Sequence, residues 1–161
     1  MGVPVRGRLT TVRPATERDV ELLATWHSDP GVSRYWDGET FTAEQMRTRL
    51  ARPRVDAFVV EDDSEPVGYI QAWWENDPLR GGLDMFLVPR ARGRGLGPDA
   101  ARALARHVRE ERGWTRVTVD PYTWNETAIR AWRKAGFVEI EERDADAEHS
   151  AAWLLMEFQS A

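Results

Sequence analysis

The chain contains no cysteine among its 161 residues. This absence excludes disulfide bonds, thiolate metal sites and a cysteine nucleophile, and it is typical of cytoplasmic proteins. Its apolar runs fall far short of the ~18 residues of a membrane span. The opening stretch "MGVPVRGRL" also lacks the apolar core of a signal peptide. We therefore expect a cytoplasmic protein that does not enter a membrane.

Positive charge is in the minority, with 22 Lys and Arg against 27 Asp and Glu, a net charge of −5. A nucleic-acid binder neutralises phosphates with a basic surface, so this balance predicts no nucleic-acid partner. Basic residues nevertheless cluster in "PRARGR" at 89–94. The asymmetry predicts one local site for an anion on a chain whose acidic remainder suits a small cationic partner.

The sequence shows no repeat, linker or low-complexity tract, so we expect a single domain spanning 1–161. Periodicity and turn residues predict strands at 8–14, 55–61, 67–75, 82–88, 114–120, 137–143 and 150–158. They predict helices at 16–27, 42–50, 98–112 and 125–136. This order favours an α/β (α+β) fold, in which hairpins at both ends flank a β-α-β centre of one mixed sheet with helices on its faces.

Three glycines, Gly93, Gly95 and Gly97, follow the strand at 82–88 and precede a helix expected to begin at Pro98. Glycines allow successive N–H groups to point at one anion, and a helix N-terminus adds a favourable dipole. Arg90, Arg92 and Arg94 supply positive charge beside them. A pyrophosphate site and a plain strand-to-helix turn with solvated arginines both fit these residues, whereas the P-loop and Rossmann patterns do not.

Two motifs carry a resemblance to a known family. Arg92-x-x-Gly95-x-Gly97 resembles the acetyl-CoA motif of GNAT N-acetyltransferases, and "NETAIRAWRKAGF" at 125–137 is similar to the helix and strand that follow it in that family. The resemblance covers nearly the whole chain. It implies the GNAT fold, a mixed and mostly antiparallel sheet splayed at its centre with helices on both faces. It also implies acetyl-CoA as co-substrate.

By this resemblance, N–H groups of the loop hold the CoA pyrophosphate. The loop residues are Arg92, Gly93, Arg94, Gly95, Leu96 and Gly97. The strand at 85–88, with Phe86, Leu87 and Val88 as cofactor contacts, is expected to pair with the pantetheine arm, and an N–H near Leu87 to polarise the thioester carbonyl. Asn125 and Trp132 are expected to contact the cofactor. Trp132 stands where many family members have a tyrosine acid, and an indole is no proton-transfer acid. Three possibilities stay open: the Trp132 N–H steadies the departing sulfur, another group such as Tyr122 protonates it, or solvent does.

Four segments, "SRYWDGE", "EPVGYIQAWW", "DPLRGGLDMFL" and "VDPYTWNETAIRAWRKAGF", look like those of aminoglycoside 6′-N-acetyltransferases. The resemblance implies acetyl transfer to a primary amine of a small polycation by direct attack in a ternary complex. Two alternatives stay open. One is an acyltransferase for a siderophore precursor, a polyamine or a protein N-terminus; the other is an acyl-CoA-binding module without turnover.

Asp84 is the candidate catalytic base, because a carboxylate can attract an ammonium group and accept its proton, and an unpaired charge in an apolar strand is costly. Without the family, pairing with an arginine or a place on the polar face explains Asp84 as well. The further residues expected to bind the acceptor are Trp36, Asp37, Trp74, Asp77, Asp120 and Tyr122. For Asp120, which precedes Pro121, a turn-forming role fits equally well. His107 and His149 show no ligand set, so no metal is expected. The sequence leaves monomer and homodimer open.

Overall fold

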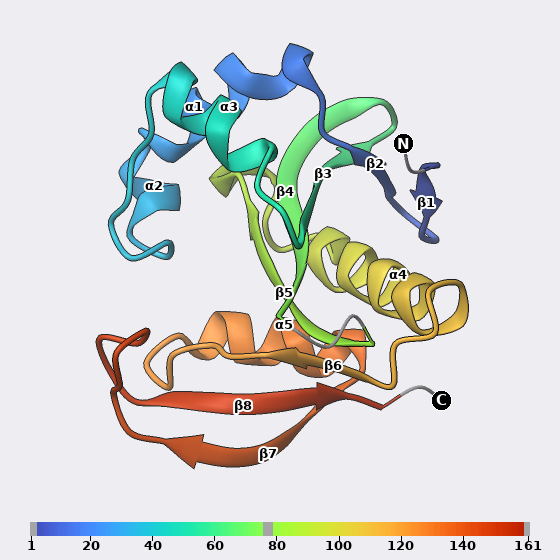
Figure 1. Cartoon of the computed structure of the whole chain (residues 1–161), viewed down its shortest axis with the longest axis vertical. Helices are drawn as coiled ribbons and strands as arrows, with labels where there is room; N and C mark the ends of the chain where they lie inside the picture. The colour runs from blue at the N-terminus through green and yellow to red at the C-terminus, as the bar shows by residue number, and fades with distance from the viewer. Residues whose placement is uncertain (1–2, 76–78, 160–161) are drawn as a thin grey trace.

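A computed structural model describes residues 3–75 and 79–159 of the chain. Its strands form one eight-stranded sheet in the order β1-β2-β3-β4-β5-β6-β8-β7 (Figure 1). The strands are β1 (Val5–Arg6), β2 (Thr11–Pro14), β3 (Val55–Asp62), β4 (Glu65–Trp74), β5 (Arg80–Leu87), β6 (Arg116–Val119), β7 (Phe137–Arg143) and β8 (Trp153–Phe158). The α-helices are α1 (Val20–His27), α2 (Pro30–Ser33), α3 (Ala43–Leu50), α4 (Leu96–Glu110) and α5 (Glu126–Ala135). Short 3-10 turns lie at Glu17–Asp19 and Pro89–Ala91.

The sheet is mixed, mostly antiparallel and splayed at its centre, as expected. Strand β5 pairs in parallel with β6 only from Arg80 to Gly82, opposite Arg116 to Thr118, whereas it pairs with β4 along its whole length. Beyond Gly82 the two central strands separate, and Figure 1 shows β6, β8 and β7 as a group below β5. The separation opens the β6-facing edge of β5 between Leu83 and Leu87, and that edge becomes part of the site described below.

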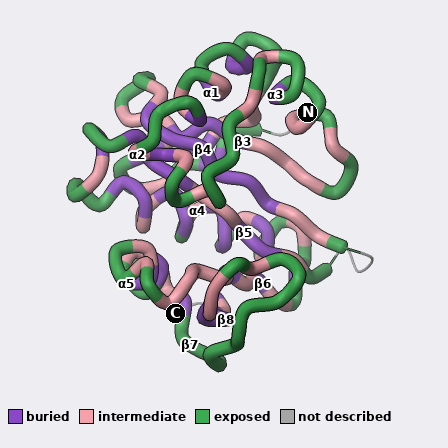
Figure 2. The backbone as a smooth tube through the Cα atoms, turned by 90° about the vertical axis from the view of Figure 1, so that its left-hand side faces the viewer, coloured by how far each residue is buried: buried purple, intermediate pink, exposed green. Residues whose placement is uncertain are grey.

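Helices cover both faces of the sheet. Helix α4 packs on β1, β2, β5 and β6, and α5 packs on α4 and β7. On the other face α1 packs on α3, and α3 packs on β3. Each face has its own apolar core, one built around Ile70, Leu104 and Met156 and the other around Leu23, Val32 and Tyr69. The central strands, buried between these layers, are drawn in purple in Figure 2.

Capping chemistry explains where two helical segments begin. Thr16 and Asp19 form a reciprocal capping box before α1, and Thr42 and Gln45 form a second one before α3. The first turn after Thr16 is a 3-10 turn, so the α-helix proper begins at Val20. Two local features differ from the prediction. The first predicted strand begins at Thr11 rather than at Arg8 and pairs with a short strand, β1, that lies before the predicted range, and the short helix α2 was not expected.

The start of α4 also differs from the prediction. The helix begins at Leu96, and Pro98 is its third residue rather than its first. Gly95 is the N-cap, with φ of +79°, a left-handed conformation that glycine adopts without a Cβ clash. Proline is tolerated at position 98 because N–H groups of the first helical turn have no intrahelical acceptor in any case.

No helix within residues 3–75 and 79–159 combines the length and apolar character needed to cross a membrane.

Candidate active site

Two adjoining cavities lie where β5 and β6 separate. The first, of about 230 Å³, is the candidate acceptor cavity, and the second, of about 200 Å³, is the candidate cofactor cavity. Five residues line both cavities: Tyr35, Met85, Asn125, Ala128 and Trp132. The two spaces are therefore contiguous, and a reaction at their boundary would involve groups from both.

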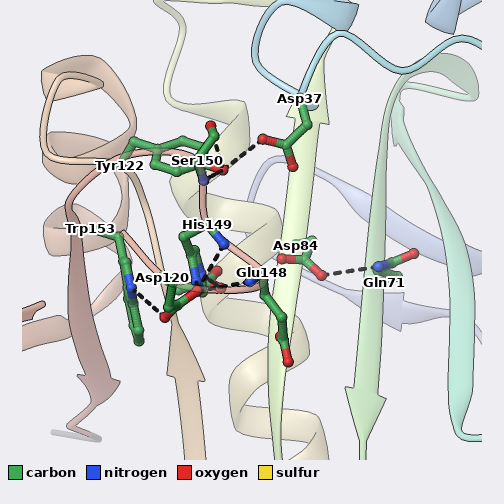
Figure 3. Close-up of polar contacts among 10 residues, drawn as sticks. Asp37, Gln71, Asp84, Asp120, Tyr122, Glu148, His149, Ser150 and Trp153 are labelled. Carbon is green, nitrogen blue, oxygen red and sulfur yellow. Dashed lines mark hydrogen bonds and ion pairs between the residues drawn. The ribbon is translucent and has the colours of Figure 1, made fainter. Parts of the chain in front are cut away.

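Carboxylates from four separate segments line the acceptor cavity. Asp84 comes from β5, Asp120 from the end of β6, Asp37 from the segment after α2, and Glu148 from the segment between β7 and β8 (Figure 3). Arg49 and His149 are the basic side chains on the same wall. The cavity thus gathers acidic groups from segments far apart in the sequence, an environment suited to a cationic ligand.

Asp84 is held by a buried relay of polar groups. The Gln71 amide donates to Asp84 Oδ2 at 3.0 Å, while Gln71 Oε1 accepts from the Tyr69 hydroxyl at 2.6 Å and from Arg52 at 3.2 Å. Gln71 lies directly opposite Asp84 in the β4–β5 ladder. The amide oxygen is fixed by two donors, so the amide nitrogen must face the carboxylate. The relay explains how a charged residue is accommodated within an apolar strand.

The environment of Asp84 suits proton transfer. Burial and, to a lesser extent, the negative charge of Asp120 together raise the pKa of Asp84 to about 7, against smaller opposing effects of Gln71, Arg52 and Arg49. A carboxylate with a pKa near neutrality can both attract an ammonium group and accept its proton.

Asp120 is paired with a histidine that the sequence analysis missed. His149 Nε2 lies 2.7 Å from Asp120 Oδ2, and His149 Nδ1 lies 2.8 Å from Asp146 Oδ1. The imidazole stacks on Trp153 with ring centroids 4.1 Å apart, and the Trp153 indole donates to Asp146. The acid-rich run around His149 was the available signal. The pairing itself depends on the β7–β8 connection reaching the end of β6, which no sequence spacing shows.

Aromatic residues form the outer wall of the acceptor cavity. The Tyr122 hydroxyl donates to Asp37 at 2.6 Å, and its ring stacks on Trp124. Trp124 also stacks on Tyr35, and Trp36 lines the cavity while packing edge-on against Tyr69. Trp36, Asp37 and Tyr122, predicted to bind the acceptor, thus lie together in this wall.

Two other residues, Trp74 and Asp77, were also predicted to bind the acceptor. Trp74 points to the α4 face of the sheet, where it packs edge-on against Trp114, so its predicted place beside the acceptor is wrong. Alternation along β4 instead puts Trp73 on the same face as Gln71, and its ring lies over Gly82. Asp77 lies outside the described residues.

The cofactor cavity is lined by the glycine loop and the start of α4. Gly93 and Gly95 have φ of +81° and +79°, and a Cβ at Gly93 would meet open space. Asp99 makes an intrahelical bond to the Gly95 carbonyl, so the N–H groups of Leu96 and Gly97 precede the helical ladder and can bind an anion. The loop therefore fits a pyrophosphate through its main chain.

The arginine side chains of this loop have other partners, contrary to the expectation that they contact the anion. Arg92 donates to the carbonyls of Leu87 and Gly31 at 3.0 and 2.7 Å. Arg94 pairs with Asp62 at 3.2 Å, and Arg90 pairs with Glu65 at 3.4 Å. Arg92 therefore ties the loop to β5 and α2, and the loop's anion-binding capacity comes from its backbone.

The open edge of β5 supplies further backbone groups. The Val88 N–H donates to Val67, so ladder alternation turns the N–H groups of Met85 and Leu87 toward the splayed edge. Phe86 and Leu87 line the cofactor cavity. Val88 is buried in the core with its N–H engaged, so the prediction that it contacts the cofactor is wrong.

Helix α5 closes the cavities from the β7 side. Asn125 caps this helix through Oδ1, which accepts from the Ala128 N–H at 3.2 Å, and its amide nitrogen is left for the cavity wall. Trp132 is buried at the boundary of the two cavities and packs edge-on against Phe137. Both residues, predicted to contact the cofactor, lie in the cofactor cavity. Within residues 3–75 and 79–159 no group of three or more potential metal ligands occurs.

The fold and these cavities together define an acyltransferase: a splayed sheet brings a main-chain pyrophosphate site and an acidic amine site to one open strand edge. Residues 8–138 of the chain match the family described as "Acetyltransferase (GNAT) domain". The chain therefore belongs to the GNAT acetyltransferase family and is an acetyl-CoA-dependent N-acetyltransferase.

Within this family, the chain is similar to aminoglycoside N-acetyltransferases. The chain is 30% identical over 146 residues to the type 1 aminoglycoside N(6′)-acetyltransferases of Klebsiella pneumoniae and Serratia marcescens, covering 79% of this chain and 73% of each relative. The solved structure of AAC(6′)-Ib in complex with paromomycin and acetyl-CoA superimposes with a TM-score of 0.81 at 27% identity, covering 94% of this chain and 93% of that one. A spermidine N-acetyltransferase from Vibrio cholerae shares the fold, with a TM-score of 0.81 at 14% identity over 93% of this chain and 95% of that one.

Proposed function

We propose that the chain transfers acetyl from acetyl-CoA to the 6′-amine of an aminoglycoside. The carboxylate-lined acceptor cavity at the open edge of β5 carries the proposal, because aminoglycosides are polycations whose sugar rings also suit aromatic walls. The relatives named as aminoglycoside 6′-N-acetyltransferases support it, as does the similarity to AAC(6′)-Ib solved with coenzyme A and kanamycin.

The glycine loop and the open edge of β5 hold and activate the acetyl donor in this proposal. N–H groups of Leu96 and Gly97 bind the pyrophosphate, and the outward N–H of Leu87 donates to the thioester carbonyl, where negative charge develops during attack. Acetyl-CoA supplies the activated acyl group.

Asp84 prepares the amine. The amine arrives as an ammonium ion, and Asp84 accepts its proton so that the nitrogen lone pair can attack the thioester carbonyl. Three further carboxylates neutralise the remaining positive charges of the acceptor: Asp120, Asp37 and Glu148. Its sugar rings pack against Trp36 and Tyr122. Attack is direct, since the chain has no cysteine for a covalent intermediate.

Position 132 holds a tryptophan rather than the tyrosine acid of many family members. Trp132 offers only an indole N–H, which can donate a hydrogen bond to the departing sulfur but transfers no proton. Tyr122 donates its hydroxyl hydrogen to Asp37 instead, and burial followed by that hydrogen bond raises the pKa of Tyr122. We infer that the nitrogen loses its second proton to solvent as the amide forms, and that the departing thiolate takes a proton from solvent.

Thiol release from acetyl-CoA tests the function across four acceptor classes: 6′-amino aminoglycosides, a matched 6′-hydroxy aminoglycoside, polyamines and lysine derivatives. We expect release with the 6′-amino sugars and at least a hundredfold lower kcat/KM for the matched 6′-hydroxy sugar, because hydroxyl and amine differ in nucleophilicity. Faster turnover of a polyamine or a lysine derivative would replace the proposed acceptor. Tight coenzyme A binding without release in any arm would indicate an acyl-CoA-binding module.

A further inference from the structure

We propose that His149, as an imidazolium ion, is a positioning residue of the acceptor cavity: it ties the Asp120 carboxylate to the segment between β7 and β8 and thereby fixes it for the acceptor's ammonium group. The inference rests on the proposed function, since it assigns a role in binding the same cationic acceptor. It concerns a residue in neither motif of the family resemblance.

Hydrogen-bond geometry identifies the protonation state. Both ring nitrogens of His149 face carboxylate oxygens, Asp120 at 2.7 Å and Asp146 at 2.8 Å. An ionised carboxylate only accepts hydrogen bonds, whereas a neutral imidazole has one donor and one acceptor nitrogen. Both contacts are satisfied together only when His149 carries two ring protons and a positive charge.

The surroundings hold this cation rigidly. The His149 side chain is 12% exposed, against 36% for Asp120 and 45% for Asp146. One ring face stacks on Trp153, and Asp146 is itself fixed by the Trp153 indole at 3.1 Å and by the His149 backbone N–H at 2.8 Å. The ion is therefore oriented from two elements, β8 and the segment before it, before any acceptor binds.

Charged groups from every neighbouring element act on His149. Asp120 faces it from the end of β6, and Asp146 and Glu148 come from its own segment. Tyr122, from the segment before α5, meets the imidazole edge-on, and Tyr122 bonds in turn to Asp37. Arg143 of β7 lies over the Trp153 ring on which the imidazole stacks. Burial lowers the pKa of His149, but the hydrogen bonds and charges of Asp120 and Asp146 outweigh it, so the pKa is raised overall.

Two effects on the reaction follow. One oxygen of Asp120 is anchored by His149, so the other is presented to the cavity at a fixed position, which lowers the ordering cost of acceptor binding. The positive charge also offsets the field of Asp120 at Asp84, since the Asp120 charge is one cause of the raised Asp84 pKa. Loss of the His149 charge would weaken acceptor binding and move the ionisation of Asp84 to higher pH.

Steady-state kinetics of His149→Gln and His149→Lys against the unaltered chain test the positioning role. Glutamine keeps a donor without charge, and lysine keeps the charge at every pH used. Below the raised pKa of His149, we expect His149→Gln to increase the aminoglycoside KM about tenfold with the acetyl-CoA KM unchanged. The ratio of the aminoglycoside KM of His149→Gln to that of the unaltered chain should return toward one at higher pH. The acceptor's own titration cancels in this ratio because it affects both enzymes equally. His149→Lys should keep a low acceptor KM to higher pH.

Three outcomes would overturn the inference. The first is a KM ratio that does not depend on pH, and the second is a lower acceptor KM in His149→Gln. The third is a loss confined to kcat with no shift in the acidic limb of the pH–rate profile. A lower KM would show that His149 competes with the acceptor for Asp120. The imidazole titration of His149 by NMR, in the unaltered chain and in Asp120→Asn, gives a readout independent of turnover. An unshifted pKa that Asp120→Asn leaves unchanged would rule out the paired imidazolium. Absence of acetyl transfer to any aminoglycoside would defeat the proposed function, while a raised pKa that Asp120→Asn lowers would still establish the ion pair.

Discussion

The chemistry of Asp84 depends on burial and on the neighbours that set its ionisation. Burial and the Asp120 charge favour the protonated form, and the amide of Gln71 favours the carboxylate. Gln71 is itself oriented by the Tyr69 hydroxyl. A group balanced in this way titrates near the pH at which an acetyltransferase must remove a proton from an ammonium ion.

Asp84→Asn removes the proton acceptor at nearly constant volume. We expect kcat to fall about 10²- to 10³-fold because general base catalysis is lost, and the acetyl-CoA KM to stay within about twofold. Steady-state thiol release measures both constants. Asp56→Asn is the matched control: Asp56 lies in β3 and pairs with Arg112 at 2.5 Å, away from the site residues, and should retain full turnover. Unchanged turnover in Asp84→Asn would remove Asp84 as the base.

Gln71→Met removes the hydrogen bond that favours the Asp84 carboxylate. The pKa of Asp84 should rise above its value of about 7, so the acidic limb of the kcat/KM profile should move to higher pH and activity should recover under alkaline conditions. A profile of kcat/KM from pH 5.5 to 9 measures the shift. An acidic limb at its original position would mean that Gln71 does not tune the base.

Among the elements, α4 determines how the chain can bind an anion. Gly95 in a left-handed conformation starts the helix immediately after the loop, and the helix N-terminus faces the cofactor cavity. Beyond the other end of the same helix, Gly113 has a similar φ of +71° with open space around it. The two glycines share a backbone requirement but only one lies at the candidate site.

Gly95→Ala and Gly113→Ala separate strain from ligand binding. Each forces alanine into a left-handed conformation, and we expect each to lower the free energy of unfolding by about 1 kcal/mol. A Cβ at Gly95 makes only an ordinary contact, 3.8 Å from Leu9. Only Gly95→Ala should raise the acetyl-CoA KM, because it alone disturbs the N–H groups of the loop. Urea unfolding and steady-state kinetics measure the two effects, and equal KM changes in both variants would contradict this account.

For the whole molecule, the core on the α1–α3 face contains a buried histidine. His27 is 2% exposed and lies among the rings of Trp36, Phe41 and Phe86. Within the described residues, its Nδ1 is the buried side-chain atom that lacks a hydrogen-bond partner. Burial, with a smaller effect of Arg49, lowers the pKa of His27 to about 4. His27 is thus structural, and it supports the wall that carries Trp36.

His27 makes folding stability depend on pH. Between pH 6.5 and 4 the unfolded chain binds a proton at His27 that the folded chain does not, so the His27 contribution to the free energy of unfolding should fall by about 3 kcal/mol as the pH decreases. In His27→Phe this contribution disappears, whereas Asp84, whose pKa is raised, contributes a slope of opposite sign in both proteins. The slope of the unaltered chain minus the slope of His27→Phe therefore isolates the effect of His27. The raised pKa of His149 adds no slope there, since its contribution is already complete below pH 6.5. Urea unfolding at pH 7, 5.5 and 4.5 measures the slope, and an equal slope in His27→Phe would disprove the assignment.

Patterns local in the chain were predictable. The capping boxes at Thr16 and Thr42, the Asn125 cap and the order of the main strands depend on neighbours within a few residues. The choice between Trp73 and Trp74 was not predictable, because a continuous apolar run hides which alternating set faces which layer. The partners of Arg92 and Arg94 were not predictable either. The sequence pattern of an arginine beside a glycine loop is the same whether its guanidinium faces a ligand or the protein.

By itself the sequence determined the family, the mixed sheet and the glycine loop, because these depend on periodicity, turn chemistry and motif spacing along the chain. Tertiary structure alone decided the surroundings of Asp84 and Asp120. Gln71 reaches Asp84 across the β4–β5 register, and His149 reaches Asp120 because the sheet order places β8 beside β6. Ionisation depends on distance in space and on burial, and both are set only when segments far apart in the chain pack together.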